Sequence, residues 1–191
     1  MTRTDPKFAS RVNGELWLAH DYGKVYAIEK TTDGNKRLCV AVSYDGSQIL
    51  RMLSRSLKEP FLLLYVLVIF RGGGKEGRYQ SDELSQKDLD AIFARYKEFW
   101  DSDGRHSIWL RSDTNDATLV YDRHNLIYAY GPLERFELVL ETLGYTATAK
   151  VSLSFEHQHC YYPEFDALER ELTAKFADRR TELRPGDENP C

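Results

Sequence analysis

The sequence predicts an α+β protein built from two tandem β-β-β-α-β-α units, with mostly antiparallel sheets covered by helices. Short segments that alternate apolar and polar residues are separated by glycine, asparagine and aspartate, a pattern typical of hairpins. Longer segments carry apolar residues at helical spacing. The order of these segments then repeats, once from residue 15 and again from residue 106.

The composition is that of a globular chain and excludes several classes of protein. Of 191 residues, 42% are hydrophobic and 29% are charged, and the formal net charge is −4 without a long basic run, so we expect no nucleic-acid partner. The longest apolar run, residues 61–70, is shorter than the roughly 20 residues of a membrane-spanning helix, so we expect no membrane partner. Three widely spaced cysteines favour reduced thiols and a cytoplasmic location.

The first predicted unit covers residues 1–103. Residues 61–70 are apolar throughout, which predicts a strand buried on both faces. Ser85 and Asp88 have the spacing of a capping box at the start of a helix. We predict strands over residues 15–20, 25–30, 37–44 and 61–70, and helices over residues 47–57 and 86–100.

The second predicted unit covers residues 104–180. Pro132 suits the first position of a helix, and Gly144 suits the end of that helix. Residues 147–155 alternate in polarity, which predicts a half-buried strand. We predict strands over residues 106–112, 118–122, 126–130 and 147–155, and helices over residues 132–143 and 163–176. Residues 181–191 are polar and predict a disordered tail, and the two units can pack into one compact domain.

The histidines are the strongest candidates for chemistry. His157 and His159 are two residues apart on an expected strand, so both rings lie on one face and can bind a metal ion such as zinc. A third ligand could come from Asp122, His124 or His106. The competing interpretation is structural, with both rings half-buried at a strand end and hydrogen-bonded to carbonyl or carboxylate groups.

The predicted topology makes this site conditional. His106 begins its strand and His124 follows the neighbouring antiparallel strand, so both lie at one sheet edge. If the strand that carries His157 runs parallel to residues 126–130, His157 lies roughly 20 Å away at the opposite edge. Only an antiparallel placement, or contact with the other unit, would gather these side chains.

Asp122, His124 and His106 are also the candidates for acid–base catalysis. The carboxylate of Asp122 can fix the tautomer of His124. The alternative is that Asp122, His124 and their neighbours only form a tight turn between two strands. Cys160 follows His159 directly, so the two side chains point to opposite faces of a strand and make a poor nucleophile–base pair.

Two further groups are candidates for binding. Arg71, Lys75 and Arg78 lie in a glycine-rich segment that lacks the spacing of a phosphate-binding loop. We expect a flexible surface loop there, with a lid or an anion-binding loop as the alternative. Tyr128 and Tyr130 could line an aromatic pocket, although tyrosines on strands more often pack against the sheet.

These observations favour a non-catalytic module that binds a protein or a small molecule and needs no cofactor. The alternative is a small enzyme with a histidine-based site in the second unit, which uses a divalent metal such as zinc. The two hypotheses differ in whether the second-unit histidines converge on one site.

Overall fold

The computed structural model describes residues 6–12, 16–153 and 155–187. The remaining residues include Glu15 of the first predicted strand, Ser154 of the strand predicted over residues 147–155, and the last four residues of the predicted tail. These positions lie outside the described residues. No helix of the described residues is long and apolar enough to cross a membrane.

The chain has an α+β fold with similar amounts of helix and strand. The first half contains β1 (Phe8–Val12), β2 (Leu16–Ala19), β3 (Val25–Lys30), β4 (Lys36–Ala41), α1 (Gly46–Ser54), β5 (Phe61–Leu67), β6 (Gly77–Gln80) and α2 (Gln86–Ser102). The second half contains β7 (His106–Ser112), β8 (Ala117–Tyr121), β9 (Leu126–Tyr130), α3 (Leu133–Thr142), β10 (Thr146–Ala147), β11 (His157–His159), α4 (Asp166–Lys175) and β12 (Arg180–Thr181).

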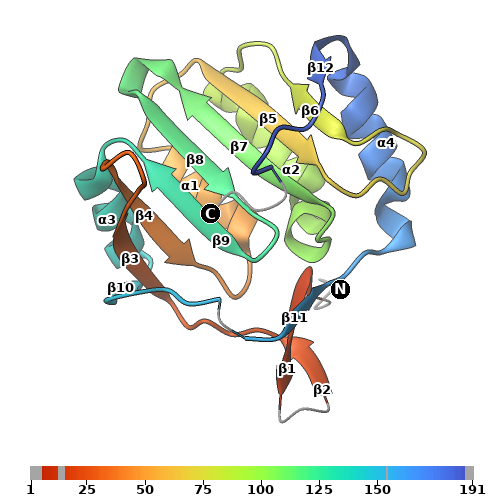
Figure 1. Ribbon diagram of the computed structural model, residues 1–191. Helices are drawn as coiled ribbons and strands as arrows, with labels where there is room; N and C mark the ends of the chain where they lie inside the picture. The colour runs from red at the N-terminus through yellow and green to blue at the C-terminus, as the bar shows by residue number, and fades with distance from the viewer. Residues whose placement is uncertain (1–5, 13–15, 154, 188–191) are drawn as a thin grey trace.

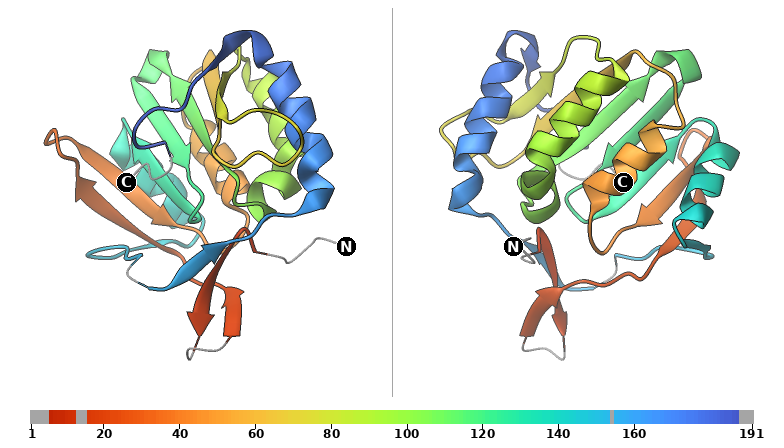
Figure 2. Two further views of the ribbon diagram at one scale, coloured as in Figure 1. Left: turned by 45° about the vertical axis from the view of Figure 1, so that its right-hand side comes forward. Right: turned by 180° about the vertical axis from the view of Figure 1, so that it is seen from behind.

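Nine strands form the main sheet in the order β10-β3-β4-β9-β8-β7-β5-β6-β12. All neighbouring pairs are antiparallel except β10 and β3. The helices α1 to α4 lie on one face of this sheet, as the view from behind shows (Figure 2). The main core lies between them, with fully buried side chains such as Leu63, Leu110, Phe99 and Trp100.

A second, three-stranded sheet has the order β11-β1-β2. It projects from one end of the main sheet (Figure 1). β11 is held to β1 by antiparallel pairing in which Phe8 faces His159 and Ser10 faces His157. The small sheet therefore joins the N-terminal segment to the segment that precedes α4.

Strands of the two predicted units interleave in the main sheet. β4 pairs with β9, β5 pairs with β7, and β10 lies beside β3, so each half contributes strands next to strands of the other. β2 lies in the small sheet, whereas its expected counterpart β7 lies in the main sheet. The helix α4 lies beside β6 of the first half (Figures 1 and 2). An internal duplication is not confirmed by this arrangement and stays a prediction.

Three predicted segments differ from the structure. The segment expected as a surface loop over residues 71–78 enters β6 at Gly77. Among the described residues of the segment predicted as a strand over residues 147–155, Ala147 alone belongs to a strand, β10, and the chain then crosses to β11. Val151 and Leu153 nevertheless pack against the helix-free face of the main sheet, so the alternation reflects one-sided burial without strand pairing. In the predicted tail, Thr181 ends β12, and Asp187 is buried because its carboxylate binds Arg78 at 2.5 Å.

Candidate metal centre

The turn between β8 and β9 places His124 at the end of the main sheet that faces the small sheet. Oδ1 of Asp122 accepts hydrogen bonds from the backbone N–H groups of His124 and Leu126, both at 2.8 Å. Asn125 completes the turn with φ of +59° and accepts a hydrogen bond from the hydroxyl of Tyr121 at 2.8 Å. The short side chain of Asp122 thus stabilises the turn through hydrogen bonds to the backbone of the turn itself.

The same carboxylate orients the imidazole of His124. Oδ2 of Asp122 lies 2.9 Å from Nδ1 of His124, and both residues are buried. In the tautomer that donates from Nδ1 to this carboxylate, Nε2 carries the lone pair. The predicted orienting pair is thus present as a contact, in the arrangement that second-sphere carboxylates have beside metal-binding histidines.

His157 and His159 reach His124 because β11 belongs to the small sheet. The backbone N–H of Cys160 donates to the carbonyl of Lys7 at 3.0 Å, and the N–H of Arg11 donates to the carbonyl of Glu156 at 3.1 Å. These bonds hold both ends of β11 against β1. The sequence predicted that His157 would reach His124 only through an antiparallel placement or through contact with the first unit. The structure brings the two histidines together because β11 pairs with β1 of the N-terminal segment, outside the main sheet.

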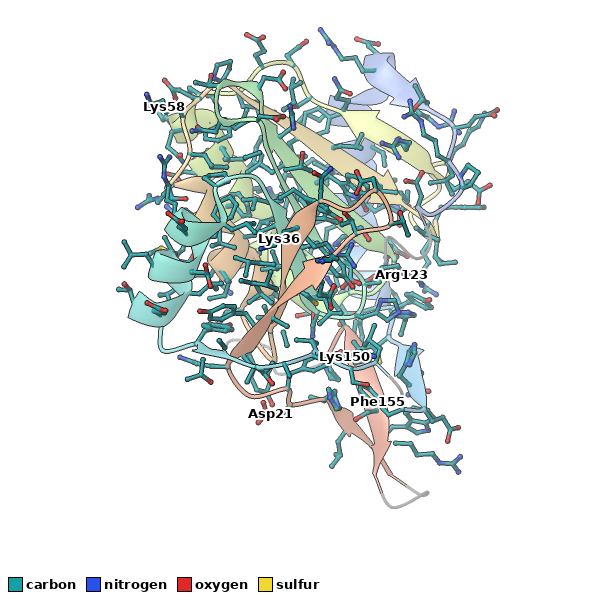
Figure 3. All side chains as sticks on the ribbon, turned by 60° about the vertical axis from the view of Figure 1, so that its left-hand side comes forward. Asp21, Lys36, Lys58, Arg123, Lys150 and Phe155 are labelled. Carbon is teal, nitrogen blue, oxygen red and sulfur yellow. The ribbon has the colours of Figure 1, made fainter. Side chains whose placement is uncertain are left out.

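The ring of Phe8 packs against all three of these imidazoles. Its centroid lies 5.7 Å from that of His124, 5.1 Å from that of His157 and 6.0 Å from that of His159. Phe8 is fully buried. Figure 3 labels Arg123 on the main-sheet side and Phe155 on the small-sheet side of this region. The histidines therefore meet on an apolar support at the junction of the two sheets.

The three histidines are close enough to share one ion. One ring nitrogen from each of His124, His157 and His159 lies within 4.8 Å of the others, and in the described parts of the chain no other group of three potential ligands meets this condition. Nδ1 of His157 lies 3.1 Å from the carbonyl of Phe155, which leaves Nε2 of that ring free. Nitrogens bound to tetrahedral zinc are about 3.3 Å apart, so small side-chain rotations would complete the site.

Burial keeps His159 in the neutral form that a metal ion requires. Desolvation, followed by the positive charge of Arg123, lowers the pKa of His159 from 6.5 to about 3. Desolvation also lowers the pKa of the neighbouring His20, whose Nδ1 lies 2.8 Å from the hydroxyl of Ser10. A neutral imidazole at neutral pH has a lone pair available for an ion.

His106 lies apart from this group. Its ring is fully buried between the main sheet and the helices, with its centroid 5.1 Å from that of Tyr65 and 4.5 Å from that of Phe99. This inward orientation is the one expected from alternation along β7, because His106 lies on the same face of the strand as Ile108 and Leu110. His106 shares the sheet edge with His124, but it points into the core and is not among the three clustered histidines.

Tyr128 and Tyr130 lie on the helix-free face of the main sheet. The guanidinium of Arg37 lies 4.2 Å from the ring centroid of Tyr128 and donates to the hydroxyl of Tyr130 at 2.8 Å. Arg37 also binds the carboxylate of Glu29 at 3.1 Å. Both tyrosines thus pack against neighbouring strands, while Tyr130 remains partly exposed.

The glycine-rich segment does bind an anion, but the anion is a side chain of the protein. The backbone N–H groups of Arg71 and Gly72 donate to the carboxylate of Glu169 from α4, at 3.1 and 2.8 Å. The hydroxyl of Tyr79 donates a hydrogen bond to the carbonyl of Lys75 at 2.6 Å. Arg78 lies on the helix-free face, 5.6 Å from the ring centroid of Trp109. These three basic residues do not converge on one place.

Sequence reasoning missed the contribution of the N-terminal segment. Phe8 and Lys7 contact the histidine region, although they are separated from it by most of the chain. Their contacts come from strand pairing between distant segments, and the segment around them carries no local motif. The only available signal was that an apolar residue, Phe8, stands in an otherwise polar stretch.

Comparison with known proteins identifies no matching family model, no similar curated protein and no similar solved structure.

Proposed function

We propose that this protein is a small metal-dependent enzyme that holds one divalent transition-metal ion, zinc by preference, between His124, His157 and His159. The observation that carries the proposal is the convergence of three ring nitrogens within 4.8 Å, one of them from an imidazole that Asp122 orients. Neutral imidazoles suit zinc and its neighbours in the first transition row. The sequence has three cysteines, all far apart, which supports a reducing, cytoplasmic setting for this function.

Three protein ligands are typical of catalytic rather than structural zinc sites. Structural sites use four ligands, whereas catalytic sites leave one position for water or substrate. At this position the ion would act as a Lewis acid on a substrate oxygen, which favours hydrolytic or hydration chemistry. His157 is the most exposed of the three ligands, so the site is open to solvent on the side of β11.

Zinc titration of the metal-free protein by calorimetry tests the proposal. We expect one ion per chain, and we expect His124→Ala and His157→Ala to abolish tight binding. Asp122→Asn should weaken zinc binding by roughly 10- to 100-fold, because the second-sphere carboxylate fixes the ligand nitrogen. His20→Asn is the matched control, since His20 also lies in this aromatic region but does not belong to the three.

The proposal fails if the wild-type protein binds no stoichiometric zinc, or if His20→Asn weakens binding as much as His157→Ala does. Circular dichroism of each variant separates a lost ligand from a lost fold.

A non-catalytic ligand-binding module is the second candidate, favoured by a cavity of about 250 Å³ on the helix-free face. Cross-strand neighbours form its floor, because Leu64 pairs with both Gln80 and Trp109, while Arg111 pairs with Leu62. The wall is mainly apolar, which suits an uncharged aromatic ligand. Binding that Trp109→Ala abolishes and His157→Ala leaves intact would support this candidate over the first.

A further inference from the structure

Two buried cations, Arg123 and Lys7, lie near enough to the three-histidine site to act on His159. Arg123 precedes His124 in the same turn and is buried, with 8% of its surface exposed. Its Nε donates to the carbonyl of Gly104 at 2.7 Å, and its Nη2 donates to the hydroxyl of Tyr161 at 2.9 Å. These partners are neutral, so they fix the guanidinium without cancelling its charge.

Gly104 brings this guanidinium to the side of His159. A Cβ at Gly104 would lie 3.0 Å from Cβ of His159 and 3.3 Å from its Nδ1, so the backbone of Gly104 packs against the side chain of His159. Only a glycine permits this approach. The guanidinium bound to the carbonyl of Gly104 is therefore a close neighbour of one proposed ligand.

Lys7 adds a second buried cation. Its side chain is fully buried, and Nζ donates to the carbonyl of Trp100 at 3.2 Å and lies 3.6 Å from the ring centroid of Tyr121. Its own carbonyl accepts the N–H of Cys160, the residue after His159. Lys7 thus enters the core directly beneath the histidine junction.

Three carboxylates, those of Asp122, Asp101 and Asp103, act on the ammonium group of Lys7. Asp103 is bound to Arg105 at 2.8 Å, and Asp101 is bound to Lys97 at 2.9 Å. Asp122 is in contact with His124, because its Oδ2 lies 2.9 Å from Nδ1 of that ring. A divalent ion held by three neutral imidazoles would add two further positive charges to this region.

We infer that the coordination position left open by His124, His157 and His159 takes an anion, so that the substrate or product of this site is a small carboxylate or oxyanion. The inference rests on the proposed metal site. The guanidinium of Arg123 is buried beside His159 with neutral hydrogen-bond partners, and an anionic ligand at the open position is attracted by this charge. A neutral ligand of the same shape gains no such attraction.

Cobalt-loaded protein tests this inference, because the visible absorption of Co²⁺ changes when its ligand set changes. Acetate and inorganic phosphate are the anionic probes, and acetamide is the neutral control of the same shape as acetate. We expect saturable spectral changes with acetate and with phosphate, and none with acetamide at equal concentration.

Two variants separate the cations from the metal ligands. Arg123→Gln and Lys7→Met should each weaken acetate binding by roughly tenfold, because a positive charge near the site is lost. Neither variant should weaken the binding of Co²⁺, since removal of a cation lowers the repulsion of the ion. Arg11→Gln is the matched control on β1, because Arg11 is 40% exposed and pairs with Glu156.

The possible failures are distinguishable. If one Co²⁺ binds per chain but acetate and acetamide act alike, the inference is wrong and the proposed metal site stands. If no Co²⁺ binds, both are wrong. If acetate binds but both variants bind it as tightly as wild type does, the assigned role of Arg123 and Lys7 is wrong, which overturns the inference.

Discussion

At the scale of single residues, one carboxylate determines what His124 can do. Asp122 both caps its turn through Oδ1 and holds Nδ1 of His124 through Oδ2. The spacing of two residues made this pair predictable from the sequence, because an aspartate can bond to groups two positions later. The support from Phe8 was not predictable, since it depends on the pairing of β1 with β11.

His106 offers a prediction about stability at this scale. Its ring is fully buried, and neither ring nitrogen has a hydrogen-bond partner among the described residues. We expect His106→Phe to raise the free energy of unfolding at pH 7.5 by about 1–3 kcal/mol, because an unmet polar group is removed. Urea unfolding measures this change, and zinc binding should be unaffected.

The same variant should change the pH dependence of stability. Burial, the largest cause, lowers the pKa of His106 well below its ordinary value of 6.5. Below pH 6.5 the imidazole therefore binds a proton in the unfolded state but stays neutral in the folded state. The free energy of unfolding falls as the pH falls, by up to about 1.4 kcal/mol per pH unit. His106→Phe should flatten this slope between pH 6.5 and 5. An unchanged slope would contradict the neutral, buried state of His106.

At the scale of elements, local signals predicted two of the helix ends correctly, whereas α1 ends at Ser54 and not at residue 57, and α4 begins at Asp166 and not at residue 163. Ser85 and Asp88 form the expected capping box at the start of α2, and Gly144 follows α3 with φ of +82°. Both signals depend only on neighbouring residues. The strand predicted over residues 147–155 depended on a partner strand, and the chain leaves the edge of the sheet after Ala147. Alternating polarity in the sequence indicates which side chains are buried, but it does not indicate whether the backbone pairs with another strand.

The attachment of α4 gives a prediction at this scale. Glu169 is fully buried, binds Arg105 at 2.5 Å and accepts the N–H groups of the segment that follows β5. We expect Glu169→Ala to lower the free energy of unfolding by about 3–5 kcal/mol, because it leaves buried donors without an acceptor. Chemical unfolding monitored by circular dichroism measures the loss.

Glu171 is the matched control on the same helix. It pairs with Arg95, but its side chain is 44% exposed. We expect Glu171→Ala to cost less than about 1 kcal/mol. Equal losses for the two variants would show that the contacts of Glu169 do not attach α4 to the sheet.

At the scale of the whole molecule, the class of fold was predictable and the path of the chain was not. Hairpin and helix patterns predicted an α+β protein, and the structure confirms it. The interleaving of the halves depends on long-range pairs such as β4 with β9, for which no local pattern exists. The convergence of the histidines has the same origin, because His124 comes from the main sheet while His157 and His159 come from the small sheet.

An ion at this junction would therefore connect the two sheets, and its coordination sphere is the most direct test of the account. X-ray absorption spectroscopy of the zinc-loaded protein should show three imidazole nitrogens and one oxygen at about 2.0–2.1 Å from the metal. In His124→Ala the number of imidazole ligands should fall to two. Sulfur at about 2.3 Å from the metal, which would point to a cysteine ligand, or an unchanged spectrum in His124→Ala, would contradict the three-histidine site.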